Sequence, residues 1–318
     1  MLPTRIAVIG AGLMGHGIAQ AFVVAGHAVA IYDPDPGRRE GALPRIKANL
    51  RLVGGEEAAA DLIMIHADLS TAVAQADVVI EAIPEDLVLK QQLFAAIEDA
   101  APARSLLASN TSAIPITRIM SVLRNRRRAM GTHWWNPPHL IPLVEVIQAA
   151  DTGEGEIAAM MELLSSIGKT PVHVRKDVPG FIGNRLQHAM WREAIALVDA
   201  GVCDAETVDT VVKSSFGRRL AVLGPLENAD LVGTDLALMV HQHILPDLDR
   251  TPGPQPFLRE LVASGCLGMK SGRGFRAWTV QTAQAVRDDL ARHLAQWDAN
   301  TRVRAEDCAI REPAPPPA

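Results

Sequence analysis

A histidine and a glutamate, both within residues 131–147, are the pair in this sequence best suited to acid–base chemistry. Glu145 lies inside the run Leu-Val-x-Val-Ile, so we expect its carboxylate to be at least half buried. A buried carboxylate needs a partner, and His133 can be that partner if the intervening prolines turn the chain back. The two residues would then form a dyad able to move a proton at neutral pH.

A glycine-rich turn near the start of the sequence gives this dyad a context. Residues 5–9 form an apolar run typical of a buried strand, Gly10, Gly12 and Gly15 follow at once, and residues 16–25 have a helical pattern. In the dinucleotide fingerprint the first glycine permits the tight turn, the second lets the backbone approach the pyrophosphate, and the third lets helix and strand pack closely. The N–H groups that begin the helix would face the phosphates.

The residue after the second predicted strand selects the cofactor. Residues 28–32 form that strand, and Asp33 follows it, where a carboxylate can accept hydrogen bonds from the adenosine ribose hydroxyls. A ribose 2′-phosphate would meet this carboxylate with only Pro34 beside it, because Arg38 and Arg39 come later and are expected on the following helix. We therefore expect NAD rather than NADP.

Length and composition indicate an ordinary globular enzyme. The 318 residues suffice for two domains, and a net charge of −5 implies no general affinity for nucleic acid or an anionic membrane. Three scattered cysteines fit a reducing compartment. No apolar run reaches membrane-spanning length, and the early first strand leaves no room for a signal peptide. We expect a cytoplasmic protein whose partner is a small-molecule substrate.

Strand and helix patterns alternate up to about residue 176, which predicts a Rossmann-type, doubly wound parallel α/β sheet. A helix is expected at residues 86–100. The further strands are expected at 62–65, 78–81, 106–108, 130–133, 143–147 and 172–174.

From residue 181 to about 263 the pattern is helical and broken at glycines. A last helix, roughly residues 279–297, precedes a proline-rich tail that we expect to be disordered. The predicted parts are an NAD-binding domain (1–177), a helical substrate and dimerisation domain (178–279), and a C-terminal helix with its tail (280–318).

The helical domain also suggests self-association. The long helix predicted at residues 181–200 is apolar on more than one face. A homodimer through these helices would cover that surface. The alternative is a monomer with a wide contact between its domains.

Together the motifs resemble those of the L-3-hydroxyacyl-CoA dehydrogenase superfamily, from residue 5 to about residue 278. The resemblance implies an NAD-dependent enzyme of fatty acid metabolism that oxidises the hydroxyl of an L-3-hydroxyacyl-CoA to a ketone. The motifs that carry it are Gly10-x-Gly12-x-x-Gly15, Glu81-Ala-Ile-Pro-Glu85, Ser109-Asn-Thr-Ser112, His133-Trp-Trp-Asn-Pro137, Glu145, Val178-Pro-Gly-Phe-Ile-Gly-Asn-Arg185 and Lys270-x-Gly-x-Gly-Phe275.

The resemblance also implies roles for single residues. His133 would take the hydroxyl proton, and Glu145 would orient its imidazole. Ser112 and Asn184 would hold the substrate oxygen. No metal is implied. The positions that match cofactor contacts are Glu85, Lys90, Asn110, Asn136 and Lys270.

One departure leaves the substrate open. Relatives that act on CoA thioesters have a long polar helical hairpin after the second strand, which carries CoA contacts. Here the corresponding stretch, residues 49–60, is short and contains Glu56 and Glu57, whose negative charge suits a phosphate tail poorly. Residues 136–142 are more similar to branches that oxidise free hydroxy acids, such as carnitine, gulonate and pyridine-carboxylate dehydrogenases. Both a CoA thioester and a small free acid remain candidates.

Other residues give weaker signals. His241 and His243 are two positions apart and do not share a helix face, so they do not suggest a metal site. The basic run at residues 124–128 is expected to be a solvated helix end rather than a nucleic-acid patch. His16 would touch the cofactor phosphates or cap its turn, and His139 would contact an anionic substrate or lie in a surface loop.

A second class of function is a non-enzymatic NAD-binding sensor. Proteins of that kind often lose a catalytic residue, whereas this sequence has all four residues that the resemblance assigns to catalysis, which favours an enzyme. Those residues are His133, Glu145, Ser112 and Asn184.

Overall fold

The computed structural model describes the backbone of residues 4–309 and the side chains of residues 4–296. The chain separates into two compact units. One contains the residues up to Arg185 and those from His293 onward, and the other is Leu186–Arg292.

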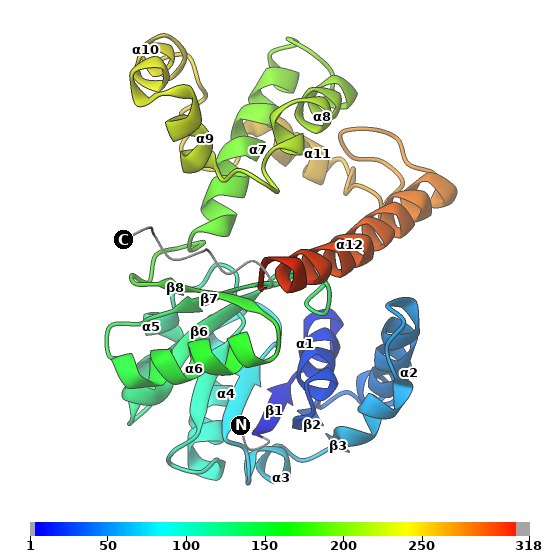
Figure 1. Ribbon diagram of the computed structural model, residues 1–318, viewed down its shortest axis with the longest axis vertical. Helices are drawn as coiled ribbons and strands as arrows, with labels where there is room; N and C mark the ends of the chain where they lie inside the picture. Colours follow the sequence, from blue (N-terminus) through cyan, green and yellow to red (C-terminus); the bar gives the residue numbers. More distant parts are fainter. Residues whose placement is uncertain (1–3, 310–318) are drawn as a thin grey trace, which may run out of the picture. The chain divides into compact units, whose positions relative to one another are not determined.

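The first unit is built on one sheet in the order β3-β2-β1-β4-β5-β6-β7-β8 (Figure 1). The strands from β1 to β6 are parallel, as predicted, but β7 runs antiparallel to β6 and β8 is parallel to β7. The expected parallel arrangement therefore holds up to β6 and is wrong for the last two strands, β7 and β8, which run in the opposite direction. The bounds are β1 (Arg5–Ile9), β2 (Ala28–Tyr32), β3 (Ile63–His66), β4 (Val78–Glu81), β5 (Leu106–Ser109), β6 (Ala129–Trp134), β7 (Leu143–Ile147) and β8 (Thr170–Val174).

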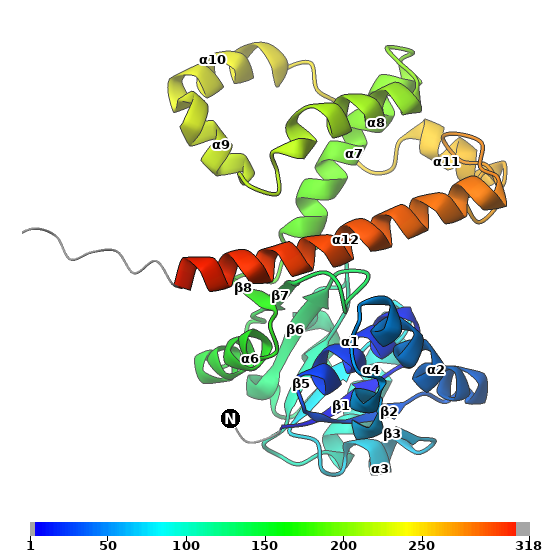
Figure 2. The ribbon, with the colours of Figure 1, turned by 45° about the vertical axis from the view of Figure 1, so that its right-hand side comes forward.

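Helices cover both faces of this sheet (Figure 2), because residues of one strand alternate between two apolar clusters. Ile6 and Val8 of β1 join the cluster that contains side chains of α1, α2 and α6, and Ala7 and Ile9 join the cluster of α3, α4 and α5. The predicted doubly wound α/β fold is confirmed. The helices are α1 (Leu13–Val24), α2 (Pro36–Leu52), α3 (Leu69–Val73), α4 (Leu87–Ala100), α5 (Ile116–Ile119) and α6 (Glu154–Ser166).

Aspartates fix where three of these helices begin. Asp35, Asp68 and Asp86 each accept a hydrogen bond from the backbone N–H three residues later, at the start of α2, α3 and α4. These caps set where the loops at the carboxyl edge of the sheet end.

Helices also make up the second unit, as predicted. Only Gln255 and Ala283 are buried in it, although its helices carry many large apolar side chains. The helix α12 continues to Ala309 rather than ending near residue 297, and the predicted disorder of the tail concerns residues outside those described. The helices are α7 (Gly183–Asp199, beginning in the first unit), α8 (Ala205–Ser214), α9 (Pro225–Val232), α10 (Thr234–Ile244), α11 (Pro256–Ala263) and α12 (Val280–Ala309, ending in the first unit).

Candidate active site

The three glycines after β1 are required for different reasons. Gly10 has a φ of 110°, and a Cβ there would lie 2.6 Å from the carbonyl oxygen of Ala82. A Cβ on Gly15 would lie 1.7 Å from the carbonyl oxygen of Gly10, so no larger residue allows α1 to pack so close to β1. Gly12 faces open space, because a Cβ there would have no neighbouring side chain or backbone atom within 4 Å. The turn therefore fits a pyrophosphate held at the start of α1.

Asp33 follows β2 and is held by two backbone groups. Its Oδ2 accepts from the N–H of Ala11 at 2.8 Å, and its Oδ1 accepts from the N–H of Asp35 at 2.9 Å. Arg38 and Arg39 lie on the following helix, α2, as expected, but their side chains reach back toward the end of β2. Arg38 Nη1 lies 3.9 Å from Asp33 Oδ2, and Arg39 Nη1 donates to the Asp33 carbonyl oxygen at 2.7 Å.

The antiparallel pairing of β6 and β7 sets His133 opposite Glu145. Nδ1 of the imidazole lies 2.7 Å from Oε2 of the carboxylate, and both side chains are buried. The proline-rich segment between the strands turns the chain back, and its Asn136–Pro137 peptide bond is cis. Because Nδ1 is engaged by Glu145, Nε2 is the ring nitrogen available to a substrate.

The second oxygen of Glu145 binds the start of α7. Oε1 accepts from the N–H groups of Ile182 at 2.9 Å and Gly183 at 3.0 Å. Burial raises the pKa of Glu145, but the hydrogen bond with His133 and these two N–H groups outweigh it and hold the pKa below its usual value. The carboxylate is therefore ionised at neutral pH and complements the positive end of the helix.

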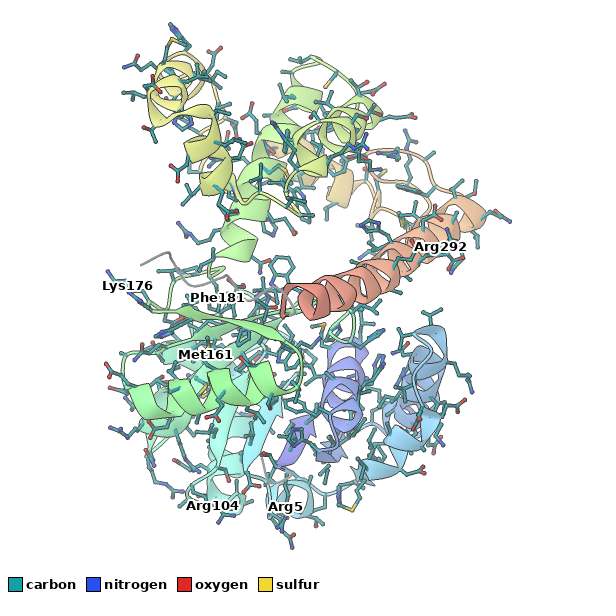
Figure 3. All side chains as sticks on the ribbon, viewed as in Figure 1. Arg5, Arg104, Met161, Lys176, Phe181 and Arg292 are labelled. Carbon is teal, nitrogen blue, oxygen red and sulfur yellow. The ribbon has the colours of Figure 1, made fainter. Side chains whose placement is uncertain are left out.

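Two aromatic rings enclose the imidazole of His133. Its ring centroid lies 5.4 Å from that of Trp135 and 5.5 Å from that of Phe181. Phe181 is in the segment that leads into α7 (Figure 3) and has a positive φ of 52°. A Cβ on Gly183 would lie 2.3 Å from Trp135 Cζ2, so glycine is needed there. Sequence reasoning missed Phe181 and Gly183 as site residues, although both lie in a quoted motif.

Glu85 organises the turn that contains Ser112. Its Oε1 accepts from the hydroxyl of Thr111 and from the N–H groups of Ser112 and Ala113, both at 3.0 Å. Burial raises the pKa of Glu85, but the Thr111 hydrogen bond, the Lys90 ammonium and the two N–H groups lower it below its usual value. The ionised carboxylate thus fixes the backbone beside the predicted substrate-binding serine.

Lys90 is buried under this turn, with its side chain 1% exposed. Its ammonium lies 2.6 Å from Glu81 Oε1 and 3.4 Å from Glu85 Oε2. Glu81 also accepts from Ser109 Oγ at 2.6 Å. Burial raises the pKa of Glu81, and Lys90 and Ser109 oppose that rise. Sequence reasoning missed Glu81, although a carboxylate that ends the apolar strand β4 is a usable signal.

The remaining predicted residues fall into two groups. In the first unit, Asn184 Nδ2 donates to the carbonyl oxygen of Ser112 at 3.1 Å, Asn110 Oδ1 accepts from the N–H of Trp134 at 2.9 Å, and Asn136 is exposed. Lys270 lies in the second unit, in the glycine-rich hook at residues 268–277, and its contact with a cofactor stays a prediction.

The weaker signals are resolved in part. His16 Nδ1 lies 2.7 Å from the carbonyl oxygen of Gly12, so this histidine closes the glycine turn. His139 is half-buried and lies close to α1, because a Cβ added to Gly17 would be 3.4 Å from its Nδ1. Burial, with help from His16 and Lys169, lowers the pKa of His139 to about 4, so it is neutral at pH 7 and supplies no charge for an anion.

The basic run is paired with acids rather than free. Its first arginine contacts Glu98 and Asp99, and the others contact Asp151, Glu156 and again Glu98. Within the part of the chain that the structure describes, no group of three potential metal ligands comes together. None of the described helices is both long and apolar enough to cross a bilayer.

Comparison with known families agrees with this geometry. Residues 5–178 match the NAD-binding domain of 3-hydroxyacyl-CoA dehydrogenase, and residues 180–278 match its C-terminal domain. The chain belongs to the 3-hydroxyacyl-CoA dehydrogenase family. It is thus an NAD-dependent oxidoreductase of the class that acts on CH–OH groups, and NAD is its cofactor.

Relatives within the family differ in substrate. The chain is 35% identical to 5-formyl-3-hydroxy-2-methylpyridine 4-carboxylate 5-dehydrogenase of Mesorhizobium japonicum, over 91% of this chain and 96% of the relative. It is 38% identical to a probable 3-hydroxybutyryl-CoA dehydrogenase of Bacillus subtilis, over 88% and 99%. It is 35% identical to L-carnitine dehydrogenase of Streptomyces coelicolor, over 85% and 88%.

Solved structures are also similar to this chain. A crystal structure of the pyridine-carboxylate dehydrogenase, called an NAD+-dependent dismutase, superposes with a TM-score of 0.87 at 35% identity, over 93% of this chain and 98% of that one. The structure of M. tuberculosis FadB2 gives a TM-score of 0.73 at 33% identity, over 87% and 99%.

Glu85 should make the stability of the protein depend on pH. The pKa of Glu85 in the folded state lies below its ordinary value of 4.5. The contribution of Glu85 to the free energy of unfolding is therefore complete above about pH 4.5 and is lost as the pH falls through the lower folded-state pKa. We expect Glu85→Gln to lower the melting temperature at pH 7 and to differ less from the parent near pH 3. The exposed Glu162→Gln, with the same charge change, should alter melting little at either pH; equal shifts in both variants would contradict the assignment.

Proposed function

We propose that this enzyme oxidises the hydroxyl group of a 3-hydroxy acid or its derivative, with His133 as the proton acceptor. Alcohol oxidation removes a proton from oxygen and a hydride from carbon, and bound NAD accepts the hydride. The protein must then take the proton. The 2.7 Å contact of Nδ1 with Glu145 supports His133 for this role, because it leaves Nε2 for the hydroxyl and lets the carboxylate stabilise the imidazolium.

Ser112 and Asn184 hold the reacting oxygen in this proposal. The Asn184 amide lies 3.1 Å from the Ser112 carbonyl oxygen, which supports a shared role. In the direction of reduction, hydroxyl and amide donors at this place stabilise the negative charge that develops on the oxygen, while the imidazolium returns the proton.

In this proposal some of the assigned residues touch the cofactor, and Lys90 acts on it through other side chains. Gly10, Gly12, Gly15 and Asp33 would hold the pyrophosphate and ribose, and Glu85, Asn110 and Asn136 would lie along the nicotinamide half. Lys90 acts through the two carboxylates that its buried ammonium pairs with, Glu81 and Glu85. Lys270 is assigned to the cofactor by its motif, and residues 1–177 are assigned as the NAD-binding domain.

A small free acid is the substrate class that we favour over a CoA thioester. The connection from α2 to β3, residues 53–62, contains Glu56, Glu57 and Asp61 and no lysine or arginine. Glu57 already pairs with Arg51 at 3.0 Å. Phosphates need cationic partners, so the acids of this connection would repel the phosphate groups of CoA. The TM-score of 0.87 to the pyridine-carboxylate enzyme supports the same choice.

The thioester remains the second candidate, because the relative at 38% identity is named as a probable 3-hydroxybutyryl-CoA dehydrogenase. A sensor function without turnover is the third, and the complete set of catalytic side chains argues against it. We also assign the protein to the cytoplasm, which cell fractionation would check.

Removing the imidazole should abolish turnover without abolishing cofactor binding. We expect His133→Ala to lower kcat by about 10²–10⁴-fold, the usual share of a general base, and to leave the Kd for NADH within about twofold. His173→Ala on β8, where the histidine contacts Gln148, is the matched control and should retain activity. Steady-state kinetics and fluorescence titration give the two readouts. A His133→Ala variant as active as the control would rule out the proton acceptor.

A substrate screen separates the candidate classes. NADH formation should be followed with 3-hydroxybutyryl-CoA, free 3-hydroxybutyrate, carnitine, gulonate and a pyridine carbinol. We expect kcat/KM for at least one free compound to exceed that for the thioester by about tenfold or more, equivalent to about 1.4 kcal/mol. Turnover of the thioester alone would overturn the choice of a free acid. No turnover of any compound would favour the sensor.

We further propose that residues 178–279 form a substrate and dimerisation domain and that the protein is a homodimer. Support comes from the helical unit, where Leu226, Leu231 and Leu238 of α9 and α10 are 79%, 70% and 62% exposed and almost nothing is buried. A surface this apolar needs a cover, and a second copy of the same face supplies one.

The dimer can be tested by light scattering after size-exclusion chromatography. We expect twice the mass of the 34.1 kDa chain for the parent and a shift to monomer for Leu231→Arg, because a buried charge without a partner opposes association. Met64→Arg, on the edge strand β3 and 58% exposed in the parent, should remain dimeric. A monomeric parent would refute the proposal.

A further inference from the structure

Phe181 combines a buried aromatic ring with an unfavourable backbone conformation. Among residues 4–309 it is the one residue other than glycine with a positive φ, at 52°. A bulky L-residue rarely adopts this left-handed region, because its Cβ comes too close to the following carbonyl oxygen, whereas glycine adopts it freely. The ring must therefore contribute something at this position that glycine could not supply.

The ring of Phe181 packs beside the imidazole of His133. The two ring centroids lie 5.5 Å apart, with the ring planes tilted by 53°. Phe181 is 1% exposed, so its ring also excludes water from this place. A single hydrogen bond to Glu145 does not fix both side-chain torsions of an imidazole, whereas packing against a second ring restricts them. The contact thus limits the directions in which the imidazole can turn.

The backbone of Phe181 acts on the other oxygen of the same carboxylate. Its N–H donates to the carbonyl oxygen of Val178 at 3.1 Å and closes a turn in which Gly180 also has a positive φ, of 75°. The two N–H groups that follow Phe181 donate to Glu145 Oε1 at 2.9 and 3.0 Å. One residue therefore places its ring on the histidine and aims backbone donors at the glutamate.

We propose that Phe181 is a positioning residue, whose left-handed backbone turns its ring onto the imidazole so that the ring holds His133 against Glu145 and keeps water from their 2.7 Å contact. A hydrogen bond shielded from water is stronger, because the local dielectric constant is lower. The arrangement of the pair does not depend on its chemistry, whereas any effect on turnover rests on the proposed function of His133 as the proton acceptor.

The order of stability of two variants tests the backbone requirement. Alanine and glycine both remove the ring of Phe181, but only alanine keeps the unfavourable left-handed conformation. We expect Phe181→Gly to melt about 2 °C or more above Phe181→Ala. The matched control is Phe94, which belongs to the same apolar cluster but lies inside α4, where glycine is the less favourable residue. Phe94→Gly should therefore melt below Phe94→Ala. The same order at both positions would overturn the proposal.

The proton between His133 and Glu145 reports how firmly the imidazole is held. Its exchange with water requires local opening of the contact and can be followed by proton NMR, with the signal assigned by its loss in His133→Gln. We expect exchange to be about tenfold faster or more in Phe181→Ala and to change by less than about twofold in Phe94→Ala, which removes an equal ring elsewhere in the cluster.

Three outcomes of this measurement would overturn the positioning role. They are unchanged exchange in Phe181→Ala, an equal change in Phe94→Ala, and exchange in the parent that is too fast to give a signal. If the smaller residues prevent folding, Phe181→Leu and Phe94→Leu retain apolar volume and lose only the aromatic plane. Faster exchange is then expected in Phe181→Leu alone, and equal exchange in the two leucine variants would contradict the proposal.

Turnover gives a separate readout. Phe181→Ala should lower kcat about tenfold and change the KM for NAD by less than about twofold, because a misplaced general base slows the chemical step without removing a cofactor contact. Phe94→Ala should leave both values within about twofold of the parent. If His133→Ala were fully active, the proposed function would fail, while the melting and exchange comparisons would still decide the role of Phe181.

Discussion

The carboxylate of Glu145 is the contact on which the arrangement of the site depends. One oxygen holds Nδ1 of His133, and the other accepts the N–H groups of Ile182 and Gly183. A single buried charge therefore joins the β6–β7 hairpin to the start of α7. Because Asn184 follows Gly183 directly, the same contact fixes where its side chain begins. The imidazole and the amide are thus positioned by one group rather than independently.

Such an arrangement has a cost, because a buried carboxylate loses its hydration. Three donors offset that loss at Glu145, and the positive end of α7 adds to them. The helix needs the carboxylate in turn, since Ile182 and Gly183 carry two of its otherwise unpaired N–H groups. The left-handed conformations of Gly180 and Phe181 bring those groups to the carboxylate.

Much of the fold could be predicted from the sequence, because buried parallel strands produce short apolar runs. The predicted bounds of β1, β2, β4 and β7 match those of the structure. The strand β3 is shifted by one residue, β5 is one residue longer, β6 is one residue longer at each end, and β8 begins two residues earlier. The antiparallel direction of β7 was not part of the predicted sheet, although the predicted pairing of His133 with Glu145 required the chain to turn back. It depends on the tight turn at the prolines, and apolar periodicity carries no information about strand direction.

The contact between His133 and Glu145 could also be predicted from the sequence, because an acid inside an apolar strand needs a partner and the prolines limited where the chain could go. Their role in catalysis stays a prediction. What the sequence could not reveal was the second half of the arrangement. Backbone N–H donors such as those of Ile182 and Gly183 are carried by every residue type except proline, so they leave no signature in the sequence.

Long side chains place charges at positions that the sequence does not reveal. Lys90 matched a cofactor position but is buried between Glu81 and Glu85, and Arg38 and Arg39 reach back from α2 to the end of β2. A lysine or arginine places its charge several bonds from its Cα, so position along the chain predicts the location of the charge poorly. The end of α12 was also predicted too early. Among its described side chains, residues 280–296, only Ala283 is buried, so little apolar pattern extends along the helix.

The acids of the first unit share one physical role. Asp33, Glu81, Glu85 and Glu145 each accept at least one backbone N–H from a neighbouring turn or helix. Each therefore closes a loop at the site, and at Glu85 and Glu145 those N–H bonds lower the pKa and favour the ionised form of the carboxyl group. With the acids committed to the backbone, the Ser112 hydroxyl and His133 Nε2 are the groups that the proposed function leaves for a substrate. In the proposed mechanism, such a site would separate the charges that hold its shape from the group that exchanges a proton, so that His133 could gain and lose a proton without releasing the loops around it.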